Sequence, residues 1–270
     1  MQLWVLGSGS SGNAVLLESD GTRLLVDAGF GPRTLAARLK MVGVDARSIA
    51  ACIVTHDHSD HVGGAGKAAR RWGWQIFATD GTASAPDLAG IAVTTFAPGD
   101  TLRVGGFEVQ TVATPHDATE PVGLLATATR SGARAGICYD VGHASDGVRA
   151  LCDSVDVLVL EANHDEGMLW AGPYPPWLRK RIASNTGHLS NRAAAQVARD
   201  VATPRLAHLV LAHLSEKNNT PVLADRTVRS ALRPTACRGK LTTTRQDAVV
   251  GPFLPRGFTS RSVEQLAFAL

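Results

Sequence analysis

The chain has 270 residues, 44% of them hydrophobic and 19% charged, and its formal net charge at pH 7 is +3. This composition is ordinary for a globular protein, and the small positive charge permits an anionic substrate without by itself indicating nucleic-acid binding. The chain holds no apolar run of the roughly 18 residues that a membrane span needs, and its first residues lack the pattern of a signal peptide. We therefore expect a single cytoplasmic domain over residues 1–270, with no membrane partner.

Short strands and one helix are predicted before residue 56. The apolar runs predict three strands, a helix with proline in its first turn and a fourth strand, at residues 3–6, 14–18, 23–27, 32–41 and 50–55. Asp20-Gly21 is a strong signal for a two-residue hairpin. The loop Gly7-Ser8-Gly9-Ser10-Ser11-Gly12-Asn13 suggests a phosphate cradle, but it lacks the lysine of a P-loop.

Directly after the fourth strand, residues 56–61 read His-Asp-His-Ser-Asp-His. Imidazole nitrogen and carboxylate oxygen are the ligands that borderline divalent ions such as zinc prefer. The alternative is a solvated histidine-rich loop, but a strand of small apolar residues leads into this cluster and a helical pattern follows it to about residue 72. The sequence therefore predicts a metal site at His56, His58, Asp60 and His61.

The rest of the chain predicts a layered α/β protein. Further strands are expected at residues 75–78, 93–96, 107–114, 122–129, 134–140, 157–161 and 206–212, and helices at 145–151, 192–201 and 222–232. Hairpins first and strand–helix pairs later suit two sheets stacked face to face with helices outside. Proline-rich residues 163–186 predict a surface excursion, and residues 262–268 a short final helix.

Polar side chains stand at the ends of several apolar runs. His116 follows one predicted strand, Asp140 closes the next but one, and His213 follows the last. Carboxyl ends of strands are the usual location of ligand sites in layered α/β proteins. His164 and His188 also lie in short polar segments. We interpret the remaining histidines, His143 in a loop and His208 inside a strand, as structural.

Taken in order, these residues resemble the ligand set of the metallo-β-lactamase-fold hydrolases, and the resemblance covers nearly the whole chain. It implies a four-layer αββα sandwich, and it includes an upstream aspartate, Asp27, that would buttress the metal loop. Within this superfamily the chain resembles the YycJ/WalJ family of predicted exonucleases. The segments that carry this finer resemblance are Gly7 to Asn13, Pro115-His116-Asp117-Ala118, Glu161-Ala162-Asn163-His164-Asp165, Gly187-His188-Leu189-Ser190-Asn191 and Leu211-Ala212-His213-Leu214-Ser215-Glu216.

The resemblance implies two divalent metal ions, zinc or manganese. It assigns His56, His58 and His116 to the first ion, Asp60, His61 and His213 to the second, and Asp140 to a bridging position. Two cations about 3.5–4 Å apart lower the pKa of a shared water and stabilise the attacking and leaving oxygens of an in-line displacement. The carboxylates Asp60 and Asp140 offset the charge of the ions, and we expect both to be catalytic.

His164 and His188 are further catalytic candidates whose roles the sequence leaves open. Each could protonate a leaving alkoxide, contact a phosphate or orient a ligand. The alternative interpretation of both residues is a loop histidine that holds backbone groups. His188 is also a substrate-binding candidate, because Ser190-Asn191 offers a helix cap and a helix amino terminus attracts anions.

The other candidate substrate-binding residues are Ser11, Asn13, Asn163, Arg179 and Arg181. The two arginines belong to the basic cluster Arg179-Lys180-Arg181, and such a cluster beside a metal centre holds phosphates. A solvated helix face is its alternative interpretation.

One departure from the superfamily pattern is Val141, which follows Asp140 where threonine or glycine is common. A second is that the chain is too short for the large inserted domain of the RNA-processing nucleases of this fold.

The leading hypothesis is a dinuclear-metal phosphodiesterase that acts on nucleic acid. The family resemblance implies a 5′-to-3′ DNA exonuclease that uses a metal-bridging hydroxide. The alternative enzyme is a small-molecule metallohydrolase, a cyclic phosphodiesterase or thioesterase, with the same metal site. A metal-stabilised binding module is disfavoured, because structural zinc sites are closed and four-coordinate. The physiological metal and the oligomeric state are left open.

Overall fold

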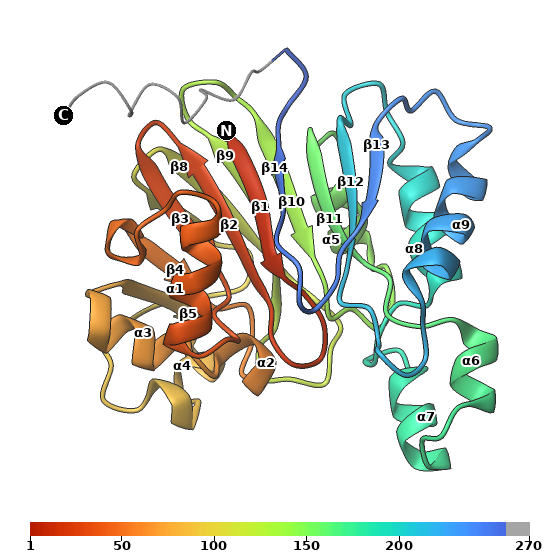
Figure 1. Ribbon diagram of the computed structural model, residues 1–270, viewed down its shortest axis with the longest axis horizontal. Helices are drawn as coiled ribbons and strands as arrows, with labels where there is room; N and C mark the ends of the chain where they lie inside the picture. Colours follow the sequence, from red (N-terminus) through yellow and green to blue (C-terminus); the bar gives the residue numbers. More distant parts are fainter. Residues whose placement is uncertain (258–270) are drawn as a thin grey trace.

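Two stacked sheets form the centre of the protein, as seen in a computed structural model that describes residues 1–257 (Figure 1). The first sheet runs in the order β14 (Val250–Phe253), β1 (Gln2–Gly7), β2 (Ala14–Ser19), β3 (Thr22–Val26), β4 (Ala51–Ile53), β5 (Gln75–Thr79) and β6 (Val93–Phe96). The second runs β13 (Lys240–Thr243), β12 (His208–Ala212), β11 (Val157–Glu161), β10 (Arg134–Cys138), β9 (Val122–Ala128), β8 (Phe107–Ala113) and β7 (Thr101–Val104).

The two sheets share one pairing pattern. In the first, β14, β1, β2 and β3 pair antiparallel and β3 to β6 pair parallel. In the second, β7 to β10 pair antiparallel and β10 to β13 pair parallel. The predicted hairpin at Asp20-Gly21 joins β2 to β3, and both of its residues have positive φ, 51° and 78°, as a type I′ turn requires.

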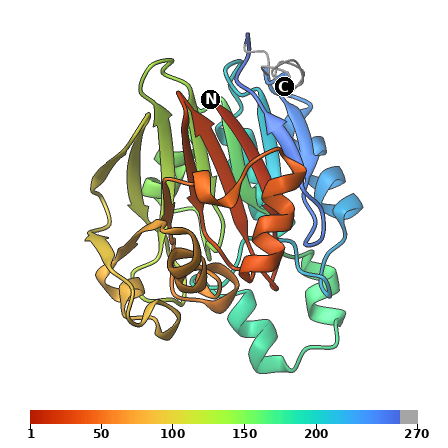
Figure 2. The ribbon, with the colours of Figure 1, turned by 60° about the vertical axis from the view of Figure 1, so that its left-hand side comes forward.

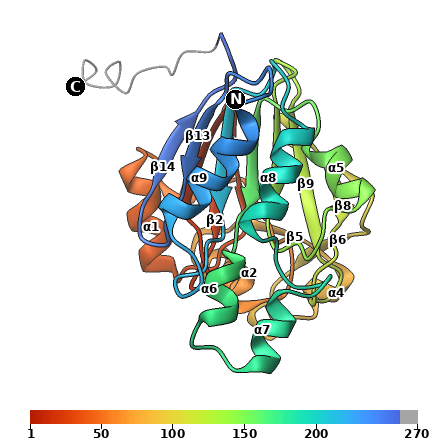
Figure 3. The ribbon, with the colours of Figure 1, turned by 90° about the vertical axis from the view of Figure 1, so that its right-hand side faces the viewer.

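Helices cover the outer faces of the sheets. The α-helices of the described residues are α1 (Pro32–Met41), α2 (Ser59–Val62), α3 (Ala65–Trp72), α4 (Asp80–Ala83), α5 (Asp146–Cys152), α6 (Glu166–Ala171), α7 (Pro176–Ile182), α8 (Asn191–Asp200) and α9 (Pro221–Leu232), with short 3₁₀ turns at Ala46–Ser48 and Pro86–Leu88. Helix α1 lies over the first sheet in Figure 2, and α5, α8 and α9 cover the second in Figure 3.

Three hydrophobic cores separate these layers. The middle core lies between the sheets and includes Leu17 and Ile53 from the first and Phe107 and Val159 from the second. The next joins the first sheet to α1 and α3, and the last joins the second sheet to α5, α8 and α9. This arrangement confirms the predicted four-layer αββα sandwich.

The structure adds elements that the sequence analysis did not predict. Strands β7, β13 and β14 are each four residues long and lie at sheet edges. Strand β14 contains Pro252, which an edge strand tolerates but which weakens the strand pattern. The predicted surface excursion contains two helices, α6 and α7. The helix predicted at residues 262–268 lies outside the described residues, and the single domain over residues 1–270 stays a prediction.

The loops that carry the candidate site emerge at one edge of the sandwich. They follow β1, β3, β4, β8, β10, β11 and β12, and in Figure 1 this edge lies at the bottom, opposite the amino terminus. Of the helices within residues 1–257, none is long and apolar enough to cross a membrane.

Candidate metal centre

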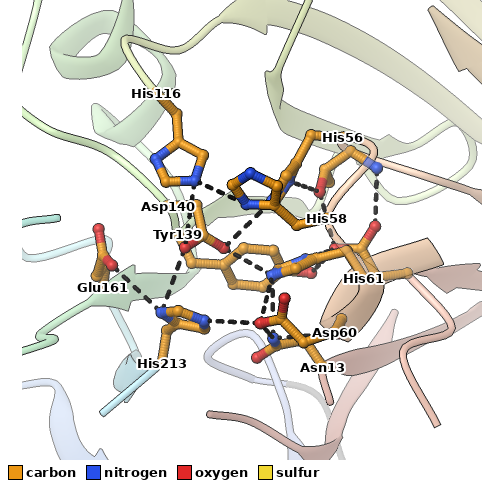
Figure 4. A network of polar contacts seen from close by, with 12 residues as sticks. Asn13, His56, His58, Asp60, His61, His116, Tyr139, Asp140, Glu161 and His213 are labelled. Carbon is orange, nitrogen blue, oxygen red and sulfur yellow. Dashed lines mark hydrogen bonds and ion pairs between the residues drawn. The ribbon is translucent and has the colours of Figure 1, made fainter. Parts of the chain in front are cut away.

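Side chains from both sheets meet at this edge. The loop after β4 and the short helix α2 carry His56, His58, Asp60 and His61. His116, Asp140 and His213 follow the carboxyl ends of β8, β10 and β12, as predicted. Figure 4 shows these side chains pointing toward a common centre around Asp140. All of the side chains that the sequence analysis assigned to the two metal ions are therefore brought together.

Their donor atoms form overlapping groups. His56, His58 and His116 each offer one atom, all within 4.8 Å of one another, and so do Asp60, His61 and His213. Asp140 lies between the two groups: its Oδ2 is 2.7 Å from His61 Nε2 and 3.9 Å from His56 Nε2. Two three-residue groups with a carboxylate between them are the arrangement that two neighbouring ions require.

The donor set fits metal ions better than it fits a purely polar network. His56 Nε2 is buried and has no hydrogen-bond partner within residues 1–257. Burial, with His61 close by, lowers the pKa of His56 well below its ordinary value. The imidazole is therefore neutral, and its unshared electron pair is available to a cation. The ring centres of His56 and His61 lie only 4.1 Å apart. This spacing is expected if the two rings bind neighbouring cations.

His213 and Asp140 influence each other's protonation. Burial opposes a charge on His213, but Asp140 and the hydrogen bonds to Asp60 and Glu161 together outweigh it and raise the pKa of His213 to about 9 in the metal-free protein. Burial would raise the pKa of Asp140, yet His213 and His61 hold it well below its ordinary value. An ion bound at His213 would therefore displace a proton.

The backbone is strained at three of the strand ends around the centre. Asp27, Asp140 and His213 have φ values of 60°, 56° and 55°, in the left-handed region that residues other than glycine rarely adopt. Each turns the chain sharply so that its side chain faces the site. Such strain persists where the surroundings hold the residue in place.

Asp27 has the supporting contacts that the family resemblance implied. Its carboxylate is fully buried and accepts hydrogen bonds from His61 Nδ1 at 2.7 Å, from the hydroxyl of Tyr139 at 2.7 Å and from the backbone N–H of Thr55 at 2.7 Å. Because His61 Nδ1 donates its hydrogen bond to Asp27, the Nε2 atom of that ring is left to face the centre.

Two asparagines proposed for substrate binding lie in the wall of the centre. Asn13 is fully buried, and its side-chain N–H₂ contacts His61 Nε2 at 3.0 Å and Asp60 Oδ2 at 3.2 Å. Asn163 is also buried and donates to the backbone oxygen of His213 at 3.0 Å. Both asparagines contact residues of the donor groups directly. Their role toward a substrate stays a prediction.

Glu161 was not among the predicted site residues. It is fully buried at the carboxyl end of β11, and its Oε1 lies 2.7 Å from His188 Nδ1 and 3.4 Å from His213 Nδ1. Its Oε2 accepts the backbone N–H groups of Val141 and Leu189. Together with Asp140, His188 and His213, Glu161 forms another group of donors within 4.8 Å. The signal was available, because Glu161 closes an apolar run as Asp140 does.

His188 lies at the centre, whereas His164 lies outside the donor groups. His188 Nδ1 is 3.1 Å from Asp140 Oδ1 as well as 2.7 Å from Glu161 Oε1. Burial opposes a charge on His188, but Glu161 and Asp140 together outweigh it and raise the pKa of His188 to about 10. His164 is buried, its Nδ1 has no hydrogen-bond partner within the described part of the chain, and burial lowers its pKa.

The remaining candidates lie farther out. Ser11 is exposed, and its backbone N–H donates to Gln246 Oε1 at 2.7 Å. Arg181 on α7 forms an ion pair with Asp117, the residue after His116. Arg179 donates to the backbone oxygen of Trp170. The two histidines interpreted as structural also have structural contacts: His143 donates to Asn185 O at 2.9 Å, and His208 packs against Phe253.

A two-sheet αββα sandwich with histidine and aspartate donors at its strand ends defines the class of metallo-β-lactamase-fold hydrolases. The chain belongs to the beta-lactamase superfamily, whose domain model matches residues 22–214. Its fold is similar to the crystal structure of the metallo-beta-lactamase fold protein YhfI from Bacillus subtilis, with a TM-score of 0.67, 19% sequence identity and coverage of 92% of this chain and 98% of that one.

Within the superfamily, the chain is similar to the proteins that the sequence resemblance indicated. It is 35% identical over 233 residues to exodeoxyribonuclease YycJ from Bacillus anthracis, a match that covers 84% of this chain and 88% of the relative. It is 31% identical over 235 residues to exodeoxyribonuclease WalJ from Streptococcus pneumoniae D39, covering 84% of this chain and 87% of the relative. The resemblance to the YycJ/WalJ family is thereby confirmed.

Proposed function

We propose that the protein is a dinuclear metal-dependent phosphodiesterase that removes nucleotides from DNA in the 5′-to-3′ direction. The observation that carries the proposal is the pair of three-residue donor groups on either side of Asp140. Similarity to two exodeoxyribonucleases over 84% of the chain supports DNA as the substrate. Zinc and manganese both suit the donor set. A cytoplasmic location stays a prediction of the sequence.

Each candidate donor has a proposed role in binding the two ions. His56, His58 and His116 would hold one ion, Asp60, His61 and His213 the other, and Asp140 would contact both. Bound there, the ions would supply a nucleophilic water at neutral pH and stabilise charge on the phosphoryl oxygens. The buried carboxylates offset the positive charge gathered at the centre.

His188 is the proposed proton donor to the leaving oxygen. Glu161 accepts the hydrogen bond from His188 Nδ1 at 2.7 Å, which fixes the ring and leaves Nε2 to face a substrate. The side chain of His188 is 20% exposed, whereas that of Glu161 is fully buried. His188 therefore reaches the solvent side of the centre, while Glu161 positions it from behind.

The experiment compares hydrolysis of 5′-phosphorylated and 5′-hydroxyl single-stranded DNA, with added manganese or zinc, by the wild-type protein and by Asp140→Asn and Asp140→Ala. Stepwise, metal-dependent release of nucleotides from the 5′ end is expected for the wild type. Both variants should lose at least one metal ion per chain and turn over about 10²–10³-fold more slowly, the effect of removing a strong electrostatic contact. Asparagine tolerates the positive φ of this position, so that Asp140→Asn isolates the charge.

Asp225→Ala is the matched control, because Asp225 is an aspartate of α9 whose partner is Arg229 on the same helix. Full activity in Asp140→Ala would overturn the assignment of the centre. A metal-loaded wild type that cleaves no DNA but hydrolyses a cyclic phosphodiester or a thioester would replace the proposed function with that of a small-molecule hydrolase.

A further inference from the structure

Helices α6 and α7 form an arm, residues 166–182, that projects from the edge of the sandwich that carries the metal centre. The arm leaves after β11 and returns just before His188. In Figure 1 it lies at the lower right, beyond the ends of the sheets, and in Figures 2 and 3 it again lies below the ends of the sheets. Nothing in the proposed reaction so far uses it.

The arm exposes two large aromatic side chains. Trp170 is 51% exposed and Trp177 is 66% exposed. Among the large apolar side chains of residues 1–257, the other exposed ones are Met41 and Val222, which lie on separate helices. Helix α7 has no buried residue in the described structure. Exposed tryptophans gathered on one uncovered segment indicate a binding surface, because scattered single apolar residues are the norm elsewhere.

The arm carries a net positive charge. Arg179, Lys180 and Arg181 follow Trp177 on α7, whereas the arm has one acidic residue, Glu166 at its first position, which pairs with Arg192 of α8. Aromatic rings beside cations are the combination that binds single-stranded nucleic acid, since bases stack on the rings and cations contact the phosphates. A duplex hides the faces of its bases. Two copies of the arm brought together by a two-fold axis would place their cations against each other.

The end of the arm is fixed to residues of the metal centre. The backbone N–H of His188 donates to Ile182 O at 2.9 Å, and the backbone oxygen of Gly187 accepts from His116 Nδ1 at 3.0 Å. A Cβ atom at Gly187 would lie 2.2 Å from Ile182 O, so only glycine permits this approach. Arg181 pairs with Asp117, beside His116. A strand bound to the arm would thus be held at a fixed position relative to the centre.

We propose that Trp170 and Trp177 form a base-stacking platform for single-stranded DNA, from which the strand enters the metal centre. The inference rests on the proposed function for the identity of the polymer. It adds the residues that hold the strand and the reason for a preference for single strands.

The test measures binding of a fluorescein-labelled oligodeoxythymidylate with phosphorothioate linkages, chosen to resist cleavage, by fluorescence anisotropy in the presence of manganese. Trp170→Ala and Trp177→Ala should each weaken binding by about 5- to 150-fold, which corresponds to about 1–3 kcal/mol per stacked base. The matched variants Trp170→Phe and Trp177→Phe should retain most of the affinity, because phenylalanine also stacks. Met41→Ala removes an exposed apolar side chain on α1 and should bind like the wild type.

Hydrolysis of bis(p-nitrophenyl) phosphate by the same variants separates the platform from the centre. This small diester has no strand to stack, so its rate should be unchanged in Trp170→Ala and Trp177→Ala while the KM for oligonucleotides rises. Equal oligonucleotide affinity in the alanine variants and the wild type would overturn the platform. So would a change of oligomeric state on tryptophan removal with DNA binding intact, since the occupant would then be a second copy of the chain.

The two proposals can fail separately. A wild type that cleaves DNA with no contribution from the tryptophans retains the proposed function and loses the platform. A wild type that binds the oligonucleotide through the tryptophans but releases no nucleotide retains the platform and loses the nuclease.

Discussion

Glu161 shows how one buried carboxylate serves several neighbours. One oxygen accepts two backbone N–H groups and the other faces His188 and His213. Burial would raise the pKa of Glu161, but His188 and His213 together outweigh it and lower that pKa to about 2. The carboxylate is therefore ionised at neutral pH, and it holds His188 in one orientation. Glu161 is a positioning residue, because it acts on the substrate through His188.

Replacing Glu161 with glutamine should lower turnover of DNA by about 10–100-fold, the usual effect of removing a partner that orients an active-site group. Hydrolysis of bis(p-nitrophenyl) phosphate should fall much less, because p-nitrophenolate leaves without needing a proton. Metal content, measured by mass spectrometry of the elements, should stay at the wild-type value. Glu166→Gln is the control, since Glu166 contacts Ser190 and Arg192 at the same end of the fold. A lower metal content in Glu161→Gln would instead make Glu161 a ligand.

At the scale of the elements, the metal loop is packed against the loops that follow β1 and β3. The backbone N–H groups of Asn13 and Ala28 donate to the backbone oxygens of Asp60 and His61 at 2.8 Å. Gly29 lies so close that a Cβ atom there would be 1.7 Å from Asp60 O. The conformation of residues 56–61 is therefore determined by neighbouring loops as well as by its own sequence.

Gly29→Ala should consequently push the backbone of Asp60 away and weaken the second metal position. We expect a loss of metal affinity, measured by competition with a fluorescent chelator, and a decrease of about 1–3 kcal/mol in the free energy of unfolding, as overpacking causes. Gly31→Ala is the matched control, because no heavy atom lies within 4 Å of a Cβ atom there. Metal affinity that is equal in the two variants would contradict this account of the loop.

At the scale of the whole molecule, the metal centre joins the two sheets. His58 comes from a loop of the first sheet and His116 from the second, and their rings carry nitrogens 3.3 Å apart. Asp60 and His213 meet across the same boundary at 3.2 Å. Each proposed ion would thus have ligands from both halves of the sandwich, and it would oppose their separation.

Removal of the metal should therefore lower the melting temperature of the whole protein. An ion present at 100 times its Kd contributes about 2.7 kcal/mol to the folded state, and each 1 kcal/mol shifts the melting temperature by about 2–4 °C in a protein of roughly this size. Chelation followed by calorimetry should show a decrease of about 5–10 °C for each ion lost, reversed by adding zinc or manganese. A melting temperature that responds equally in Asp140→Asn and wild type would contradict binding at this centre.

The amino-acid sequence by itself was sufficient to select the candidate metal donors that the fold brings together, and to predict the layered architecture. His56, His58, Asp60 and His61 lie in one short segment, and His116, Asp140 and His213 each stand at the end of an apolar run. Donor chemistry and strand ends are local properties, so they can be recognised without knowing which strands are neighbours. The hairpin at Asp20-Gly21 was predictable for the same reason.

Only the tertiary structure decided which distant residues meet. Asn13 belongs to a loop that looks like a phosphate cradle, yet the fold buries it against Asp60 and His61. Glu161 faces His188 because β11 lies beside β10 and β12, an order that no local pattern encodes. The edge strand β14 and the arm depend likewise on distant partners, since a short or proline-rich segment becomes ordered through the contacts that the rest of the fold supplies.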